Sequence, residues 1–116
     1  MKIRSYVVVE LKKGLSETCY RFFSILGNPT RLAVLEALTE GAMNVSQLAE
    51  SLGQEQSMIS HNLRPLVRCR FVEVERRGKE RFYRVNHDTV GSLFKIVEMH
   101  AENYCPTGGR CQERDG

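Results

Sequence analysis

The sequence predicts a mainly α-helical domain that carries one two-stranded β-hairpin. Along most of the chain, apolar residues recur at three- and four-residue steps, which is the period of a helix packed on one face. The period changes to alternation only in "FVEVERRGKERFYRV", residues 71–85, around a turn at Arg77-Gly78-Lys79. The chain has 116 residues, of which 41% are apolar, so it fits one domain with its own core. We therefore expect five helices and one hairpin.

Helix-ending residues divide the first half of the chain into three helices. "GLSETCYRFFSILGN" is predicted to be helical, with Ser16 as a cap and Gly27 as the stop. "NPTRLAVLEALTEG" begins again at Asn28, with Pro29 at the first helical position. "NVSQLAESLG" forms a short third helix that ends at Gly53.

Two further helices flank the hairpin. The fourth is predicted from about residue 55 to 69, and Pro65 inside it is expected to kink the helix or loosen its last turns. The last runs over residues 87–105 and stops before Pro106. Its predicted apolar stripe contains Val90, Leu93, Phe94, Val97, Ala101 and Tyr104. The domain is thus expected at residues 15–105, between an N-terminal arm (1–14), whose structure the sequence leaves open, and a Gly-rich, cysteine-containing tail (106–116).

The third and fourth helices are joined by the tight connection "GQEQ", which is typical of a helix-turn-helix. A two-stranded ribbon directly after such a pair makes a winged helix-turn-helix, whose second helix enters the major groove of DNA. Side chains that can bond bases or phosphates gather near the start of the fourth helix and on the hairpin. The predicted DNA-binding residues are Gln54, Gln56, Ser57, Ser60, His61 and Arg64 on the helix, and Arg76, Arg77, Lys79 and Arg81 on the wing. Met58, Ile59, Leu63 and Leu66 are expected to face the core.

Charge agrees with a polyanion partner for one segment of the chain. The net charge is +3, but residues 54–85 carry eight Arg or Lys against four Glu, whereas residues 86–116 carry three basic against five acidic residues. Charge alone is also compatible with a solvated surface, so the DNA interpretation depends on the helix pair and the ribbon beside it.

Three blocks of the sequence resemble the ArsR/SmtB family of bacterial and archaeal repressors. They are "LGNPTRLAVLEAL", "VSQLAESLGQEQSMISHNLRPLV" and "FVEVERRGKERFYRV", and the similarity covers roughly residues 16–104. The resemblance implies a homodimer formed through the first and last helices. It also implies a repressor that leaves its operator DNA when an inducer, often a metal or metalloid, binds. Asn62 and Pro65 depart from the family's pattern, in which a second histidine and a regular helical residue are common.

The family's two usual inducer sites are not evident in this sequence. The third helix lacks the Cys-x-Cys pattern of the thiolate site. On the last helix, His87 and His100 match two of four Asp/His positions, but Thr89 and Asn103 occupy the others. The two histidines are about 20 Å apart along one helix, so they could share an ion only across a dimer.

The cysteines are stronger inducer-site candidates. Cys105 and Cys111 flank the short segment "PTGGR", and thiolates suit thiophilic ions such as arsenite or zinc. Cys19 could join them because the first and last helices are neighbours in the family, and His100 could be a fourth ligand if the helix end unwinds. Cys19 could instead be a core residue. Oxidation of Cys105 and Cys111 would give a redox- or sulfide-responsive repressor. Cys69 is expected to be a packing residue.

Other classes of protein are disfavoured. The chain has no signal peptide pattern and no apolar run near 18 residues, so a cytoplasmic protein without a membrane partner is expected. Neither a catalytic triad, nor a phosphate-binding glycine loop, nor a carboxylate pair indicates an enzyme. A winged-helix module that binds protein instead of DNA is the more remote alternative.

Overall fold

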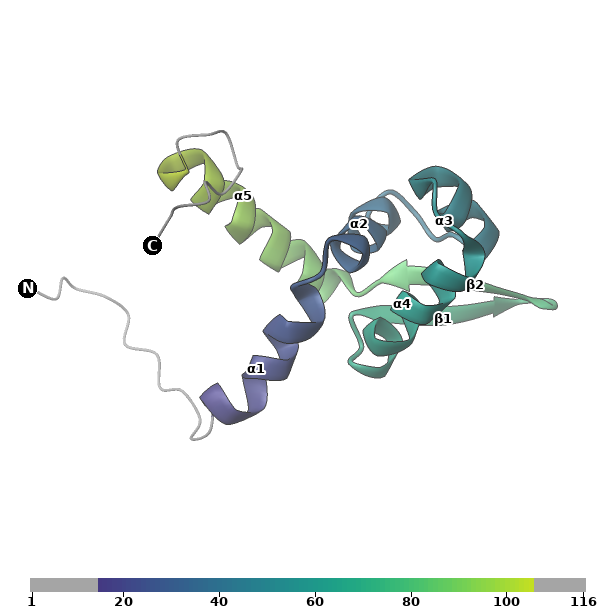
Figure 1. Ribbon diagram of the computed structural model, residues 1–116, viewed down its shortest axis with the longest axis horizontal. Coiled ribbons are helices and arrows are strands. Elements are labelled where there is room, and N and C mark those ends of the chain that lie inside the picture. The colour runs from purple at the N-terminus through teal and green to yellow at the C-terminus, as the bar shows by residue number, and fades with distance from the viewer. Residues whose placement is uncertain (1–14, 106–116) are drawn as a thin grey trace, which may run out of the picture.

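The computed structural model describes residues 15–105, with side chains from residue 20 onward. Five α-helices and one antiparallel hairpin follow in the order expected from the sequence (Figure 1), which confirms the fold class, and a π-helical turn precedes the last helix. The elements are α1 (Leu15–Leu26), α2 (Pro29–Leu38), α3 (Val45–Leu52), α4 (Gln56–Arg68), β1 (Val72–Arg77), β2 (Glu80–Val85), the π-turn η1 (His87–Gly91) and α5 (Ser92–Tyr104).

Side-chain caps begin α2 and α3 where the sequence predicts. The Asn28 side chain accepts a hydrogen bond from the Arg31 backbone N–H at 3.0 Å, and Pro29 occupies the first turn of α2. At α3, Asn44 and Gln47 form a reciprocal capping box with distances of 2.8 and 2.9 Å. Gly53 ends α3 with φ of 64°, a left-handed conformation that glycine adopts without steric cost.

The core lies where α2, α3 and α4 pack against one another and against the base of the hairpin. Val34, Leu35, Leu48, Ile59 and Leu66 are completely shielded from solvent. The remaining buried apolar residues are Leu26, Leu38, Ala49, Leu63, Phe71, Val72, Val85 and Val90. Because three of the core residues come from α4, one side of that helix is fixed by packing.

The hairpin pairs Val72 with Val85 at its base and Arg77 with Glu80 at its tip. Gly78, with φ of 65°, opens the two-residue turn, which confirms the predicted hairpin. Tyr83 and Met43 exchange two backbone hydrogen bonds of 2.8 and 3.0 Å, which attach the wing to the segment before α3.

Three expectations from the sequence are wrong in detail. Helical spacing predicts Met58 in the core, but 46% of its surface is exposed because it lies at the edge of the buried side of α4. The last helix is not regular over its whole predicted length, since it begins with the π-turn η1. Cys69, predicted to be a packing residue, is exposed just after α4.

Pro65 does not loosen the end of α4. The helix continues to Arg68, and the Cys69 backbone N–H donates to the Pro65 carbonyl at 3.0 Å. Pro65 is buried, so packing retains the turn that follows it although the His61 carbonyl loses its usual donor.

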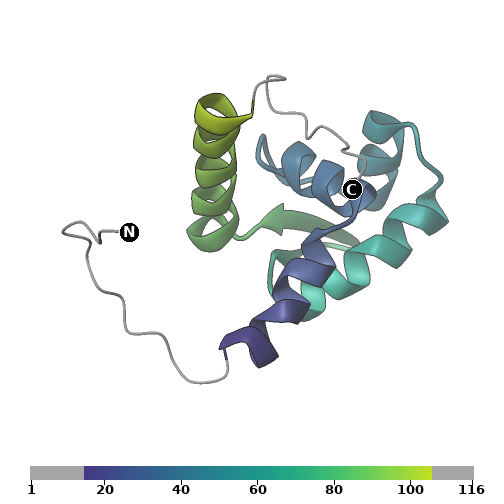
Figure 2. The ribbon, with the colours of Figure 1, turned by 60° about the vertical axis from the view of Figure 1, so that its left-hand side comes forward.

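The domain has two ends of different character (Figures 1 and 2). α1 and α5 project at one end, while α3, α4 and the tip of the hairpin form the other. Within residues 15–105, no helix is long and apolar enough to cross a membrane.

Two valines on β1 test this packing. We expect Val72→Ala to lower the free energy of unfolding by about 2 kcal/mol, because Val72 is 1% exposed and its methyl groups leave a cavity. Val74→Ala, at a position 42% exposed on the same strand, should cost less than about 1 kcal/mol. Urea denaturation measures both. Equal losses for the two variants would contradict the described core.

Candidate nucleic-acid interface

The side of α4 that faces away from the core is polar and exposed. Ser57, Ser60, His61 and Arg64 all lie on it, as the three- and four-residue spacing predicts. Gln54 and Gln56 are also exposed at the start of the helix. The Gln56 side-chain amide donates to the Ser46 hydroxyl at 3.2 Å, which ties the start of α4 to α3. The structure thus gathers the predicted helix residues onto one accessible surface.

The start of α4 is suited to an anion. Glu55 precedes the helix, but its side chain makes no capping hydrogen bond. The first backbone N–H groups of a helix carry a partial positive charge and are ready donors to a phosphate. Ser57 and Ser60 add short hydroxyl groups that allow a close approach to nucleic acid.

Arg68 is a further basic residue on this surface that the sequence reasoning did not include. It is exposed and follows Arg64 by four residues, so the two side chains lie one above the other on the same face. The four-residue spacing from Arg64 to Arg68 could have predicted this position from the sequence. The exposed surface of α4 is therefore more basic at its C-terminal end than expected.

The wing presents its basic residues on two different faces. Arg76 and Arg81 are directly opposite each other in the strand register, so their side chains share one face. Both are exposed, and neither has an ion pair with the described residues. Lys79 is exposed in the turn beside them. Like charges opposite each other are unfavourable in water alone, and an anion between them relieves that repulsion.

The other face of the wing is largely neutralised within the protein. Arg77 donates from Nε to Glu75 Oε2 at 3.2 Å, and its guanidinium lies 4.4 Å from the centre of the Phe82 ring. Arg84 pairs with Glu73 at 3.3 Å. Such surface contacts are worth about 1 kcal/mol or less each. Arg77 would nevertheless have to give them up to bind a phosphate, whereas Arg76 and Arg81 would not.

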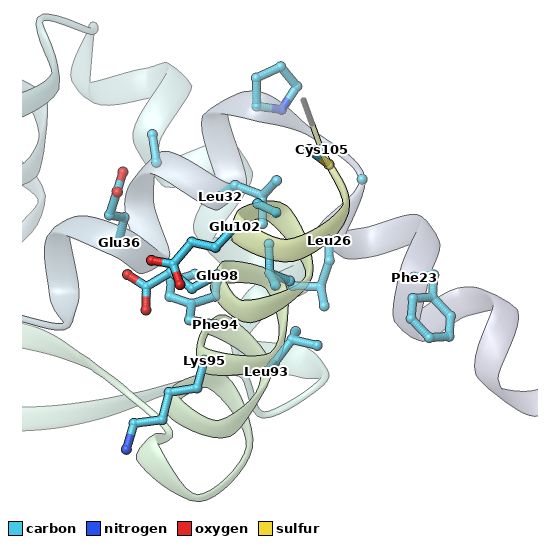
Figure 3. A pocket seen from close by; sticks show the side chains of 15 residues that line it. Phe23, Leu26, Leu32, Glu36, Leu93, Phe94, Lys95, Glu98, Glu102 and Cys105 are labelled. Atoms are coloured by element: carbon cyan, nitrogen blue, oxygen red, sulfur yellow. The ribbon is translucent and has the colours of Figure 1, made fainter. Parts of the chain in front are cut away.

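Cys105 is the thiol candidate whose position the structure describes. It ends α5, is half-buried, and lines a cavity of about 1090 Å³ between α5 and the α1–α2 corner (Figure 3). Leu26, Leu32 and Phe94 line the same cavity, and Glu98 and Glu102 lie along one side of it. The side chain of Cys19 and the whole of Cys111 fall outside the described residues.

The histidine candidates are exposed. His87 opens η1, and the His100 ring lies 5.1 Å from the Tyr104 ring on the surface of α5. Among residues with described side chains, no three His, Cys, Asp or Glu groups come close enough to hold a metal ion. The predicted ligand set of Cys19, Cys105, Cys111 and His100 therefore depends on groups that are not described, and it stays a prediction.

Comparison with known proteins agrees with this geometry. The family model for the arsR family of bacterial regulatory proteins matches residues 28–74, which run from the cap of α2 to the middle of β1. The uncharacterized HTH-type transcriptional regulator MJ1325 of Methanocaldococcus jannaschii is 34% identical over 83 residues, covering 71% of this chain and 93% of its own. The arsenical resistance operon repressor of Staphylococcus xylosus is 30% identical over 75 residues, covering 65% of this chain and 72% of its own.

The match spans only part of some relatives, and a solved structure shares the fold. The HTH-type transcriptional regulator NmtR of Mycobacterium tuberculosis is 36% identical over 78 residues. That match covers 67% of this chain and 65% of NmtR. A homodimeric winged helix-turn-helix DNA-binding domain, fragment 1–100 of Mb0332 from Mycobacterium bovis, superposes with a TM-score of 0.73 and 24% identity. That match covers 93% of this chain and 100% of the fragment.

The relatives are named as transcriptional regulators or as a repressor, and the family model covers the helix pair and the first residues of β1. The chain belongs to the ArsR/SmtB family of winged helix-turn-helix transcriptional regulators.

Proposed function

We propose that the protein is a dimeric repressor that binds operator DNA through α4 and the wing and releases it when a thiophilic metal or metalloid binds near Cys105. The observation that carries the DNA-binding part is the division of α4 into a buried side and an exposed polar side. Ile59, Leu63 and Leu66 are at most 2% exposed, while Ser60 and Arg64 on the opposite side are open to solvent. A helix held in this way can enter the major groove without losing its contacts to the core.

The wing extends the same binding surface. Arg76, Lys79 and Arg81 lie at the end of the hairpin, which Figure 1 shows projecting beyond the helices. Basic side chains at such a tip can reach the DNA backbone or the minor groove beside the helix. We assign base contacts to the first half of α4, and phosphate contacts to Arg68 and to the wing.

The dimer is supported by the exposed apolar side chains of α1 and α5. The α5 helix has no fully buried residue, although it is rich in apolar side chains. Tyr20 and Phe23 on α1, and Ile96, Val97, Met99 and Tyr104 on α5, are each between 55 and 72% exposed. Apolar surface of this extent is typical of an interface. A second copy that packs on α1 and α5 would cover these side chains and the cavity beside Cys105.

The charged groups on α1 are compatible with such an interface. Arg21 donates from Nε to the Tyr20 hydroxyl at 3.3 Å, and this hydrogen bond raises the pKa of Arg21 above its ordinary value. The guanidinium also lies 5.8 Å from the centre of the Tyr20 ring. The positive charge is therefore held beside the Tyr20 ring.

The inducer part rests on the place of Cys105. Cys105 directly follows α5, which carries part of the proposed interface, and it precedes Cys111 by six residues in the sequence. Thiolates from Cys19, Cys105 and Cys111 would bind arsenite or zinc, with His100 as a further ligand if the end of α5 unwinds. A related repressor is named for arsenical resistance, which supports this class of inducer. A disulfide between Cys105 and Cys111 is the alternative response.

A pair of wing variants tests the DNA surface. We expect Arg81→Ala to weaken binding to every duplex and to lower the slope of log affinity against log salt by about one for each phosphate that the variant no longer binds. Arg77→Ala should have a smaller effect, because Glu75 and Phe82 already engage that side chain. Fluorescence anisotropy with a duplex selected from randomised DNA measures both quantities.

The two arginines are matched controls because each substitution removes one charge from the same hairpin. A larger decrease in affinity for Arg77→Ala would show that Arg77 leaves its intramolecular partners and would reverse our assignment of the two faces. No salt-dependent binding by the unsubstituted protein would contradict the DNA-binding proposal itself.

A second test concerns the inducer. Arsenite added to the reduced protein on its selected duplex should release the DNA, whereas the Cys105→Ser protein should stay bound. Cys69→Ser is the matched control, because Cys69 is an exposed thiol outside the proposed site and its removal should leave the response intact.

The outcomes separate the two kinds of inducer. Release by a mild oxidant but not by arsenite would replace the metal response with the disulfide. Release of the Cys105→Ser protein by arsenite would remove Cys105 from the inducer site.

A further inference from the structure

One guanidinium joins the end of α1 and the start of α2 to the middle of α4, on the buried side of the DNA-binding surface. Arg31, in the first turn of α2, donates from one terminal nitrogen (Nη1) to the Ile25 carbonyl in the last turn of α1 at 3.1 Å. Its Nε donates to Asn62 Oδ1 on α4, also at 3.1 Å. The planar guanidinium fixes the directions of both bonds, so α1, α2 and α4 are held in one relative orientation.

Asn62 completes this contact from the side of α4. Its amide nitrogen donates to the Met58 carbonyl one turn earlier at 3.0 Å, so both ends of the side-chain amide are satisfied. Asn62 is 4% exposed and is the one buried polar side chain among the residues with described side chains. Burying an amide costs little folding free energy only while its hydrogen-bond partners stay in place.

The position of Asn62 on α4 gives this contact a consequence for DNA binding. Asn62 lies on the helix side opposite Ser57 and Arg64, at the edge of the apolar residues Ile59 and Leu66. Apolar packing tolerates small rotations of a helix, whereas hydrogen bonds of fixed direction do not. A rotation of α4 that moved its polar face would break the Arg31–Asn62 bond.

We propose that Arg31 and Asn62 are positioning residues that hold the exposed face of α4 in the orientation in which it distinguishes DNA sequences. The inference rests on the proposed DNA-binding function and deepens it. Since Ile25 belongs to α1, which carries part of the proposed dimer surface, the same contact connects the dimer to the DNA-binding helix. Because both side chains are engaged within the protein, we assign neither of them a contact with DNA, and we expect the phosphate contacts to be unaffected.

A role in stability alone predicts a different result from a role in positioning. Asn62→Leu removes one of the two acceptors of the Arg31 guanidinium, and Arg31→Met removes the donor to both Asn62 and the Ile25 carbonyl, so each single change should destabilise the fold. The double variant Arg31→Met/Asn62→Leu replaces the polar pair with apolar groups and should recover most of the stability. Positioning predicts that the double variant still discriminates poorly between DNA sequences.

The experiment measures stability and discrimination together. Urea denaturation gives the stability of each variant, and anisotropy gives its affinities for a duplex selected by the unsubstituted protein and for a duplex of the same composition in shuffled order. We expect the ratio of these affinities to fall about tenfold in the double variant, with the salt slope unchanged. A double variant that regains both stability and full discrimination would overturn the proposal.

A second variant keeps the test informative if the double variant does not fold. Arg31→Lys retains the charge and a donor, but its ammonium group cannot reproduce the planar fork that bonds Ile25 and Asn62 together. We expect this protein to fold and to show reduced discrimination. Full discrimination by Arg31→Lys would also overturn the positioning role.

The comparison with the unsubstituted protein separates the two proposals. If the unsubstituted protein binds neither duplex, the proposed function fails and this inference fails with it. If it discriminates and the variants discriminate equally well, the positioning role alone is refuted.

Discussion

The structure depends on the packing that fixes α4 about its own axis. Ile59, Leu63 and Leu66 bury one side of this helix against α2 and α3, so the other side must face solvent. The buried amide of Asn62 adds hydrogen bonds of fixed direction to that packing. At the far end of α4, Arg70 adopts a left-handed conformation with φ of 64°, and its carbonyl accepts a hydrogen bond of 2.9 Å from the Asn86 amide. Contacts along the helix and just after its end thus specify which side chains of α4 can approach DNA.

A second constraint is that the described part of the protomer leaves α5 largely uncovered. The helix directly follows η1 and lies at the opposite end of the domain from the wing (Figure 1). Within residues 15–105, its apolar side chains have little partner surface. This separation would let a dimer form at one end while α4 and the wing stay accessible at the other. Arg31 lies between the two ends and contacts both α1 and α4.

Much of the fold could be predicted because its signals are local. Asn28, Asn44 and Gly53 mark helix ends through backbone chemistry, and the turn at Gly78 sets the register of the hairpin. The exposed polar residues Ser57, Ser60, His61 and Arg64 follow from helical spacing alone. Features that depend on partners distant in the sequence could not be predicted in this way. The pairing of Arg31 with Asn62 spans 31 residues, and the contacts that occupy Arg77 depend on strand register and side-chain direction. Spacing assigned Met58 to the core because it cannot locate the edge of the buried side.

The central claim is that one rigid surface, made of the exposed side of α4 and the tip of the wing, contacts DNA. Backbone amide chemical shifts of the isotope-labelled protein, followed by NMR as the selected duplex is added, test it most directly. We predict that the largest changes fall on residues 54–64 and 76–81, with smaller changes in the core of α2. Changes concentrated on α1 and α5, with residues 54–64 unaffected, would contradict this account.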